Sequence, residues 1–349
     1  MKKALKFFIF LVVVAIISLG ASVLWSRKQD ANTAPISERF NGTAEYTPAQ
    51  KGSIALTTET ASFPMLIESR QEIRYYHART GEIKSVDLKK PTPAKLIAKI
   101  KPQATKISWS PDGTEIIATV GGVNTYVNLS TGTSKQLAKT IINPQFSRDS
   151  NQVAYVYFND TTGVGTISIA DSQFKNFKNI IKTRLKNWEI QWNGPRRLSL
   201  IATSAETTMD SLYSTDTSTG GLDLLLDSKS SIQTNWAPDG NSLLYSRKTR
   251  KVIELFALEL DSRQSVPLGL VGTANKCAWT SDSSTLYCAI TKDKDDSFIK
   301  ISASKVETIF SPVESGFMDA RDLVYSTIRN ALIFTNFKDG RLYELSLAQ

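Results

Sequence analysis

The stretch 105–120, TKISWSPDGTEIIATV, decides the fold of this 349-residue chain. Apolar and polar residues alternate on both sides of a Pro-Asp-Gly turn, which predicts an antiparallel β-hairpin. A four-residue loop at the turn would pair Trp109 with Ile116. It would also pair Ile107 with Ala118, so that all four apolar side chains lie on one face of the hairpin. A register shifted by one residue would place a glutamate opposite the tryptophan, and we therefore reject it.

The same phrase recurs along the chain as an aromatic residue, a turn and an apolar strand. Its copies begin at Trp109, Phe146, Trp192, Trp236, Trp279 and Tyr325. The intervals are 37, 46, 44, 43 and 46 residues, and counting back places a first copy near Leu56. Seven units of four-strand size predict an all-β, seven-bladed β-propeller, with six or eight blades as alternatives. A β-sandwich followed by a second domain is the competing interpretation, but it does not require a recurring aromatic-turn signal.

The last copy of the repeat, residues 323–349, supplies only three strands before the sequence ends. A fourth strand must then come from elsewhere, because an open sheet edge is a liability. We expect residues of about 38–48 to close the ring by pairing with the last blade. The predicted organisation is an N-terminal segment 1–28, a linker with a possible closing strand 29–48, and a propeller 49–349.

The N-terminal segment predicts the compartment. Phe7–Trp25 is a run of 19 residues without a charge, close to the length of about 20 residues that spans a bilayer as a helix. Basic residues flank the run, namely Lys2, Lys3 and Lys6 before it and Arg27 and Lys28 after it. The excess before the run predicts a single-pass anchor with its N-terminus in the cytoplasm. A cleaved signal peptide is the alternative, and both place the propeller outside the cytoplasmic membrane.

Charge and composition exclude several classes of protein. The net charge is +9, but without the five basic residues of the N-terminal segment 37 basic and 33 acidic residues remain. That balance is not typical of a nucleic-acid binder, which presents a clustered basic face. With one His and two Cys in the chain, multi-His metal sites and Cys₄ zinc sites are excluded. We therefore expect no metal and no cofactor.

At the turn phrases the chain resembles the Pro-Asp propeller repeat of the TolB type, which also occurs in propellers of prolyl-peptidase-like enzymes. Trp109–Gly113 and Trp236–Gly240 match this WD40-like phrase well, and Phe146–Ser150 and Trp279–Ser283 match it weakly. The resemblance covers about residues 50–349 and implies the architecture rather than a function. The Trp-Asp repeat is a poorer match, because that family uses a His in most blades.

The repeated turn residues are candidates for structure rather than chemistry. This structural turn motif comprises Trp109, Asp112, Gly113, Trp236, Asp239, Gly240, Trp279 and Asp282, with Asp149 at the matching position of a weaker copy. Metal binding or catalysis by these aspartates is one interpretation. Capping of each turn is the other, and we favour it because the turns lie about one blade apart. His77, expected on the third strand of its blade, is interpreted as a structural or surface residue, since no G-x-S-x-G occurs.

Two further sets of residues stand out. The hairpin register places Cys277 opposite Cys288, within reach of a disulfide, and two buried thiols are the alternative. The loops between second and third strands vary most, and they include a basic set and an acidic set. The basic set is Arg247, Lys248, Arg250 and Lys251, and the acidic set is Asp293, Asp295 and Asp296. A docking surface for a protein or an anionic glycan is one interpretation, and a solvated rim of opposite charges is the other.

The sequence thus predicts a monomeric, non-catalytic propeller that binds or scaffolds a partner at the cell envelope. The partner would be an envelope protein or a glycan. Two alternatives remain: a hydrolase or lyase acting on an envelope saccharide, and a sensor that binds a small ligand or glycan at the channel mouth. An enzyme would need convergent carboxylates at that mouth.

Overall fold

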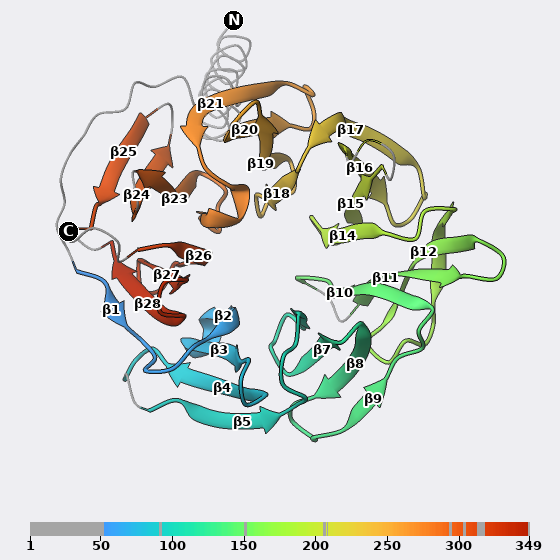
Figure 1. Ribbon diagram of the computed structural model, residues 1–349, viewed down its shortest axis with the longest axis horizontal. Coiled ribbons are helices and arrows are strands. Elements are labelled where there is room, and N and C mark those ends of the chain that lie inside the picture. Colours follow the sequence, from blue (N-terminus) through green and yellow to red (C-terminus); the bar gives the residue numbers. More distant parts are fainter. Residues whose placement is uncertain are drawn as a thin grey trace, which may run out of the picture.

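The computed structural model describes residues 52–90, 93–149, 152–204, 207, 209–292, 295–302, 305–312 and 318–347. In these residues, 28 strands form seven four-stranded antiparallel sheets. The sheets stand as blades around a central axis, each with its first strand innermost (Figure 1). The all-β, seven-bladed propeller is confirmed. Within the described ranges no helix has the length and apolar character needed to cross a membrane, and Phe7–Trp25 lies outside those ranges.

The first four blades each consist of four consecutive strands. Blade 1 contains β2 (Ser62–Ile67), β3 (Glu72–His77), β4 (Glu82–Asp87) and β5 (Lys95–Lys99). Blade 2 contains β6 (Lys106–Trp109), β7 (Glu115–Val120), β8 (Val123–Asn128) and β9 (Ser134–Gln136). Blade 3 contains β10 (Ile141–Phe146), β11 (Gln152–Asn159), β12 (Val164–Asp171) and β13 (Lys178–Thr183). Blade 4 contains β14 (Trp188–Trp192), β15 (Arg197–Thr203), β16 (Met209–Asp216) and β17 (Leu222–Ser230).

The remaining blades follow the same order until the last. Blade 5 contains β18 (Gln233–Trp236), β19 (Ser242–Thr249), β20 (Val252–Glu259) and β21 (Ser265–Val271). Blade 6 contains β22 (Cys277–Trp279), β23 (Thr285–Lys292), β24 (Asp295–Ser302) and β25 (Lys305–Phe310). Blade 7 contains β26 (Ala320–Ser326), β27 (Ala331–Asn336), β28 (Arg341–Ser346) and, from the start of the described chain, β1 (Ile54–Ala55). Single 3₁₀ turns occur at Glu68–Arg70 and Ala274–Lys276.

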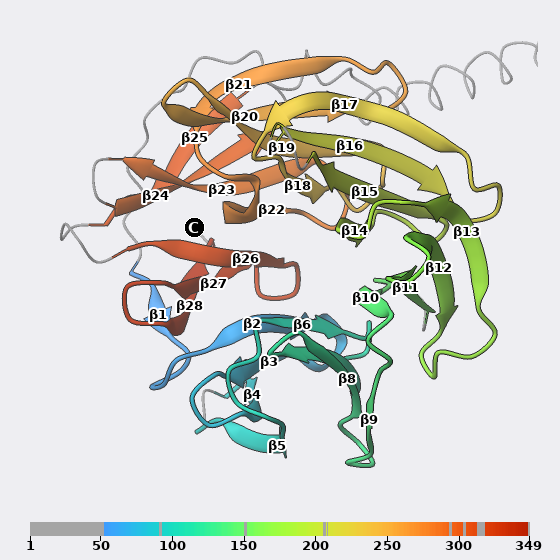
Figure 2. The ribbon, with the colours of Figure 1, turned by 45° about the vertical axis from the view of Figure 1, so that its right-hand side comes forward.

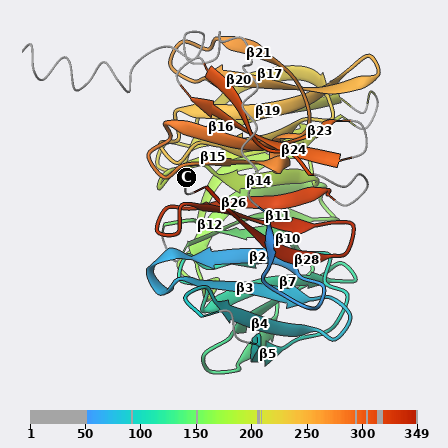
Figure 3. The same cartoon turned by 90° about the vertical axis from the view of Figure 1, so that its left-hand side faces the viewer.

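The ring is closed by a short strand that precedes blade 1. Ile54 and Ala55 of β1 pair with Glu344 and Tyr343 of β28, and in Figures 1 and 3 the blue β1 lies against the red strands of the last blade. The N–H of Leu342 also donates to Oγ1 of Thr57, at 3.0 Å. Closure by an N-terminal segment is confirmed, but its position is corrected. The closing strand is at 54–55, whereas the expected segment 38–48 lies outside the described residues.

The predicted hairpin register is confirmed in blade 2. Trp109 lies opposite Ile116, and the next apolar pair is Ile107 with Ala118. In blade 1, however, the residue equivalent to Trp109 is Leu66, which lies opposite Ile73 on the next strand. Leu66 precedes Trp109 by 43 residues, so the first repeat begins ten residues later than the expected Leu56. The expected position was wrong because Leu66 is not aromatic, so the signal that marks the other copies is missing in blade 1.

The recurring tryptophans connect neighbouring blades. Nε1 of Trp109 donates to the carbonyl oxygen of Phe63 in the preceding blade, at 2.9 Å. Trp192 and Trp279 make the equivalent bond to the innermost strand before theirs, at 3.1 and 3.3 Å. Apolar residues of neighbouring blades form shared clusters, as between blades 3 and 4 and between blades 4 and 5, and Figure 2 shows successive blades side by side. An aromatic residue with one N–H donor is therefore well suited to this position.

The turn aspartates cap their own turns. Asp112 accepts hydrogen bonds from Oγ of Ser110 and from the N–H and hydroxyl of Thr114. Asp239 accepts from the N–H of Asn241, at 2.9 Å. The glycine that follows Asp239 has φ +69°, and a Cβ on it would lie 2.4 Å from the carbonyl oxygen of Asn193. Both the aspartate and the glycine thus serve the turn geometry.

Removal of one such cap gives a pH-dependent loss of stability. The hydroxyl of Thr280 and the N–H of Ser284 bond the carboxylate of Asp282 and lower its pKa from 3.8. A carboxyl whose pKa is lower in the folded than in the unfolded protein contributes its full stabilisation above the unfolded-state pKa. This contribution is lost as the pH falls through the folded-state pKa. At pH 7 we expect Asp282→Ala to lower the free energy of unfolding by about 0.5–1 kcal/mol. In urea denaturation the difference from wild type should shrink below pH 3.8, and a constant difference down to pH 2 would contradict this reasoning.

The two cysteines lie opposite each other across β22 and β23, as the register predicts. Cys277 and Cys288 form a disulfide, and neither is exposed to more than 2%. We expect denatured, unreduced protein to show no reactive thiol and reduced protein to show two. Since the bond closes a short loop, Cys277→Ala with Cys288→Ala should cost about 2–3 kcal/mol of unfolding free energy. Two thiols that react before reduction would refute the bond.

Candidate functional site

The innermost strands surround a central channel. A cavity of about 770 Å³ occupies it and is lined from six of the seven blades. Its lining is mixed, with the aromatic residues Trp192, Trp236, Trp279 and Tyr325, and the amide or hydroxyl side chains Gln145, Gln191, Thr234, Asn235 and Asn275. Every innermost strand is the end strand of its sheet, so one backbone edge of each faces the channel. The wall therefore offers hydrogen-bonding groups together with aromatic surface.

Three innermost strands carry the same irregularity. Phe63, Asn143 and Asp322 each lie three residues before the aromatic-phrase position, and each has a positive φ, of 53°, 48° and 52°. The strand register shifts at all three places. A non-glycine residue in this conformation costs about 1–3 kcal/mol and often marks a functional region. Phe63 and Asn143 serve the fold. The carbonyl of Phe63 accepts a hydrogen bond from Trp109, and the side-chain amide of Asn143 donates to the carbonyl of Trp188.

Asp322 differs from the other two bulge residues. It lies on the innermost strand β26, is exposed, and has no hydrogen bond or ion pair among the described residues. Desolvation by the surrounding protein raises its pKa above 3.8, although Arg321 opposes this. On β6, desolvation likewise lowers the pKa of Lys106, opposed by Glu189. Groups that lose hydration in this way are candidates for a functional site.

The channel also holds a lone cation at the end nearer the turns between first and second strands. Arg148 lines the cavity, has no acidic partner in the described part of the chain, and has its pKa lowered by desolvation. Glu68 lines the same cavity but is already engaged, since it accepts from the N–H of Thr327 at 2.6 Å and the hydroxyl of Ser326 at 3.1 Å. Arg148 is therefore the charge available to an incoming group.

The basic docking residues are at the tip of blade 5. Arg247 and Lys248 lie at the end of β19, and Arg250 and Lys251 form the turn to β20. Lys248, Arg250 and Lys251 are exposed and have no acidic partner among the described residues. The guanidinium of Arg247 lies over the ring of Phe256, 4.3 Å from its centroid. Three of the four thus reach solvent.

The acidic docking residues are not where the sequence analysis placed them. Asp293 lies outside the described residues, but Asp295 and Asp296 belong to β24 and are only 8% and 1% exposed. Asp295 accepts from the N–H of Met318 at 2.8 Å. Asp296 accepts from the N–H of Ala320 at 2.7 Å and bonds the ammonium of Lys276 at 2.8 Å. The expected exposed loop of opposite charge is wrong, because these carboxylates fasten blade 6 to the start of blade 7.

The same connection recurs in other blades. In blade 4, the hydroxyl of Thr203 donates to Asp210, and Asp210 accepts from the N–H of Ile232 in blade 5, both at 2.7 Å. In blade 2, Asn124 accepts from a threonine and donates to the carbonyl of Ile141 in blade 3, at 2.9 Å. Three acidic residues at this end of the ring, Asp210, Asp295 and Asp296, are thus used between blades.

His77 lies at the end of β3, the second strand of blade 1, rather than on the expected third strand. Its Nδ1 is 2.7 Å from the hydroxyl of Thr80 and 3.9 Å from Glu82. In the described part of the chain, no group of three or more His, Cys, Asp or Glu side chains is placed to hold a metal ion.

No protein-family model and no curated protein matches this chain. Among solved structures it is similar to an oligogalacturonate lyase in complex with manganese, at 11% identity and a TM-score of 0.64, over 87% of this chain and 97% of that chain. It is also similar to the β-propeller domain of the Trilobed protease from Pyrococcus furiosus, at 14% identity and a TM-score of 0.55, over 83% of this chain and 95% of that chain. For TolB from Acinetobacter baumannii the identity is 13% and the TM-score 0.47, over 67% of this chain and 61% of that chain. At such identities the likeness concerns the propeller fold alone.

Proposed function

We propose that this protein is a non-catalytic binding module of the cell envelope that takes an extended segment of a partner protein into its channel. The channel wall is the observation that carries the proposal. Strand edges and amide side chains suit a peptide backbone, and the partly exposed Trp279 and Tyr325 suit its side chains. The Nε2 of Gln145, on this wall, is buried and has no hydrogen-bond partner among the described residues.

The use of the acidic residues supports binding over catalysis. Asp210, Asp295 and Asp296 are 8% exposed or less and accept backbone N–H groups of the next blade. A carboxylate held in this way is a poor general acid or base, because a proton transfer would break the connection between blades. The basic tip of blade 5 supplies a second contact for an acidic partner.

The proposal places the propeller outside the cytoplasmic membrane. The uncharged run Phe7–Trp25 and the basic residues before it support a single-pass anchor. The disulfide between Cys277 and Cys288 is consistent with an oxidising compartment.

A channel-filling variant tests the proposal. Gln191 lines the channel, whereas Gln136 is exposed on β9, the outermost strand of blade 2. The matched variants Gln191→Trp and Gln136→Trp would be tagged and purified from solubilised membranes, and the co-purifying proteins quantified. We expect one partner to be recovered at least about tenfold less with Gln191→Trp and at the wild-type level with Gln136→Trp. Equal recovery of all proteins with both variants would reject the channel as the binding site.

An enzyme acting on a saccharide is the second candidate, and Asp322 is the observation that favours it. An exposed carboxyl with a raised pKa on an innermost strand could serve as a general acid. If so, the wild-type protein should release reducing ends from envelope glycans and Asp322→Asn should not. Absence of release by the wild type would leave binding as the function.

A further inference from the structure

A row of polar side chains crosses one face of blade 1. Arg74 on β3 lies directly opposite Ser85 on β4, and Ser85 lies directly opposite Lys95 on β5. Since directly opposite residues project to the same side of a sheet, a guanidinium, a hydroxyl and an ammonium are neighbours on this face. Arg70, in the 3₁₀ turn after β2, lies at the end of the row.

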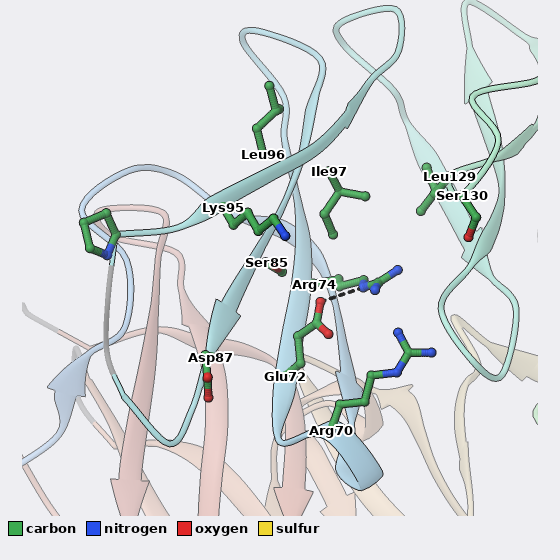
Figure 4. Close-up of a pocket in the computed structure, with 11 residues that line it drawn as sticks. Arg70, Glu72, Arg74, Ser85, Asp87, Lys95, Leu96, Ile97, Leu129 and Ser130 are labelled. Carbon is green, nitrogen blue, oxygen red and sulfur yellow. Dashed lines mark hydrogen bonds and ion pairs between the residues drawn. The ribbon is translucent and has the colours of Figure 1, made fainter.

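This row forms one wall of a groove between blades 1 and 2. The cavity measures about 610 Å³, and Leu129 and Ser130 of blade 2 form the opposite wall. In Figure 4, Arg74, Ser85 and Lys95 lie together on one side, and Arg70 approaches from below. The volume is in the range of small-ligand sites. The groove lies at the outer part of the ring and shares no lining residue with the central channel.

The charges in the groove are not balanced. Arg74 is 91% buried, and its Nε bonds Glu72 while its Nη1 donates to the carbonyl of Gly113, both at 2.8 Å. Glu72 is therefore neutralised. Asp87, the other acid, accepts from the N–H of Lys89 and keeps its negative charge, so three cations face two carboxylates in the groove. Arg70 and Lys95 have no ion pair or hydrogen bond among the described residues.

A hydroxyl that faces the groove offers a donor to a ligand. Ser85 is only 9% exposed, yet its side chain makes no hydrogen bond among the described residues and lines the groove. Its Oγ is not a buried atom without a partner, so it is open to the groove and can donate to a group bound there. Apolar surface adjoins it, because Ile97 lines the groove and is only partly buried. A ligand that offers an acceptor oxygen with negative charge and an apolar body would satisfy both.

We propose that the groove between blades 1 and 2 binds an organic carboxylate with an apolar body. The carboxylate lies between Arg70 and Lys95 and accepts from the hydroxyl of Ser85, and the apolar body packs on Ile97. Such a group occurs on a free small acid and at the C-terminus of a peptide. This site is independent of the channel, so either proposal can fail alone.

Direct binding tests the groove. The purified chain would be titrated calorimetrically with 4-phenylbutyrate and with the peptide Ala-Ala-Phe. The control for each acid is the compound in which its carboxylate is replaced by an amide. We expect the free carboxylate to bind at least about tenfold more tightly than its amide, and the tighter of the two acids identifies the source. Equal binding of acid and amide, or no binding of either acid at millimolar concentration, would overturn the proposal.

Variants assign the binding to these residues. Arg70→Gln with Lys95→Gln should weaken carboxylate binding at least about tenfold, and Ser85→Ala several-fold. Lys182→Gln with Arg184→Gln is the matched control, since both residues are exposed on blade 3. Thermal unfolding checks that each variant is folded. An effect of the control pair as large as that of the groove pair would show only non-specific attraction and would refute the site.

Discussion

Replacement of Asp296 by alanine is expected to lower the free energy of unfolding by about 3–5 kcal/mol. The Asp296 carboxylate is 1% exposed, and it accepts from the N–H of Ala320, the hydroxyl of Thr291 and the ammonium of Lys276, at 2.7, 2.7 and 2.8 Å. Its loss leaves a backbone N–H unsatisfied and a buried ammonium with one carboxylate fewer. Since total stability of a domain is about 5–15 kcal/mol, urea denaturation should show the change clearly.

The exposed ion pair of blade 3 supplies the control. Asp160 is 74% exposed and bonds Lys186 at 2.6 Å, and Asp160→Ala should cost less than about 1 kcal/mol. The remaining partner of Lys276 is Asp319. Burial raises the pKa of Asp319, but the hydrogen bonds from Lys276 and Arg321 outweigh it and hold the pKa below 3.8. A cost for Asp296→Ala no larger than that for Asp160→Ala would show that the acidic residues of blade 6 are not structural.

Replacement of Trp236 by alanine is expected to cost about 3–5 kcal/mol as well. Trp236 is 2% exposed, lies at the interface of blades 4 and 5, and donates from Nε1 to the hydroxyl of Ser199 at 3.0 Å. Alanine would leave a large cavity between the two blades. Trp236→Phe keeps much of the packing but loses the hydrogen bond, so it should cost about 1–3 kcal/mol.

An exposed aromatic residue provides the comparison for Trp236. Phe177 is 64% exposed, and Phe177→Ala should change the unfolding free energy by less than about 0.5 kcal/mol. The urea midpoint of each variant measures these differences. Similar midpoints for Trp236→Ala and Phe177→Ala would mean that the recurring tryptophan does not hold neighbouring blades together.

The fold could be predicted because the apolar alternation within each repeat determines how its strands pair. The alternation around Trp109 admits one pairing that keeps apolar residues on one face, and the same rule placed Cys277 opposite Cys288. Copies of a unit at similar intervals then fix the number of blades. The first copy was misplaced because Leu66 is not aromatic, so no aromatic residue marked its position.

Much of the candidate site was beyond sequence reasoning. Asp296 follows a run of charged residues, which suggested an exposed loop, and its partner Ala320 lies in the next blade. The row of Arg74, Ser85 and Lys95 depends on the pairing of three strands, because neighbours in the row are about ten positions apart in the chain. The bulge at Asp322 has no turn-forming residue to mark it. The contact of Asp296 joins two blades, whereas the other two features depend on the strand register within a single blade.

Site-specific photo-crosslinking in intact cells tests the central claim most directly. A photoreactive phenylalanine analogue would replace Thr234, which lines the channel, or Gln136, which is exposed on the outermost strand β9. If the channel takes up a segment of a partner protein, irradiation should give a discrete crosslinked product at Thr234 and none at Gln136. Products of the same sizes at both positions, or no product at Thr234, would contradict a binding channel.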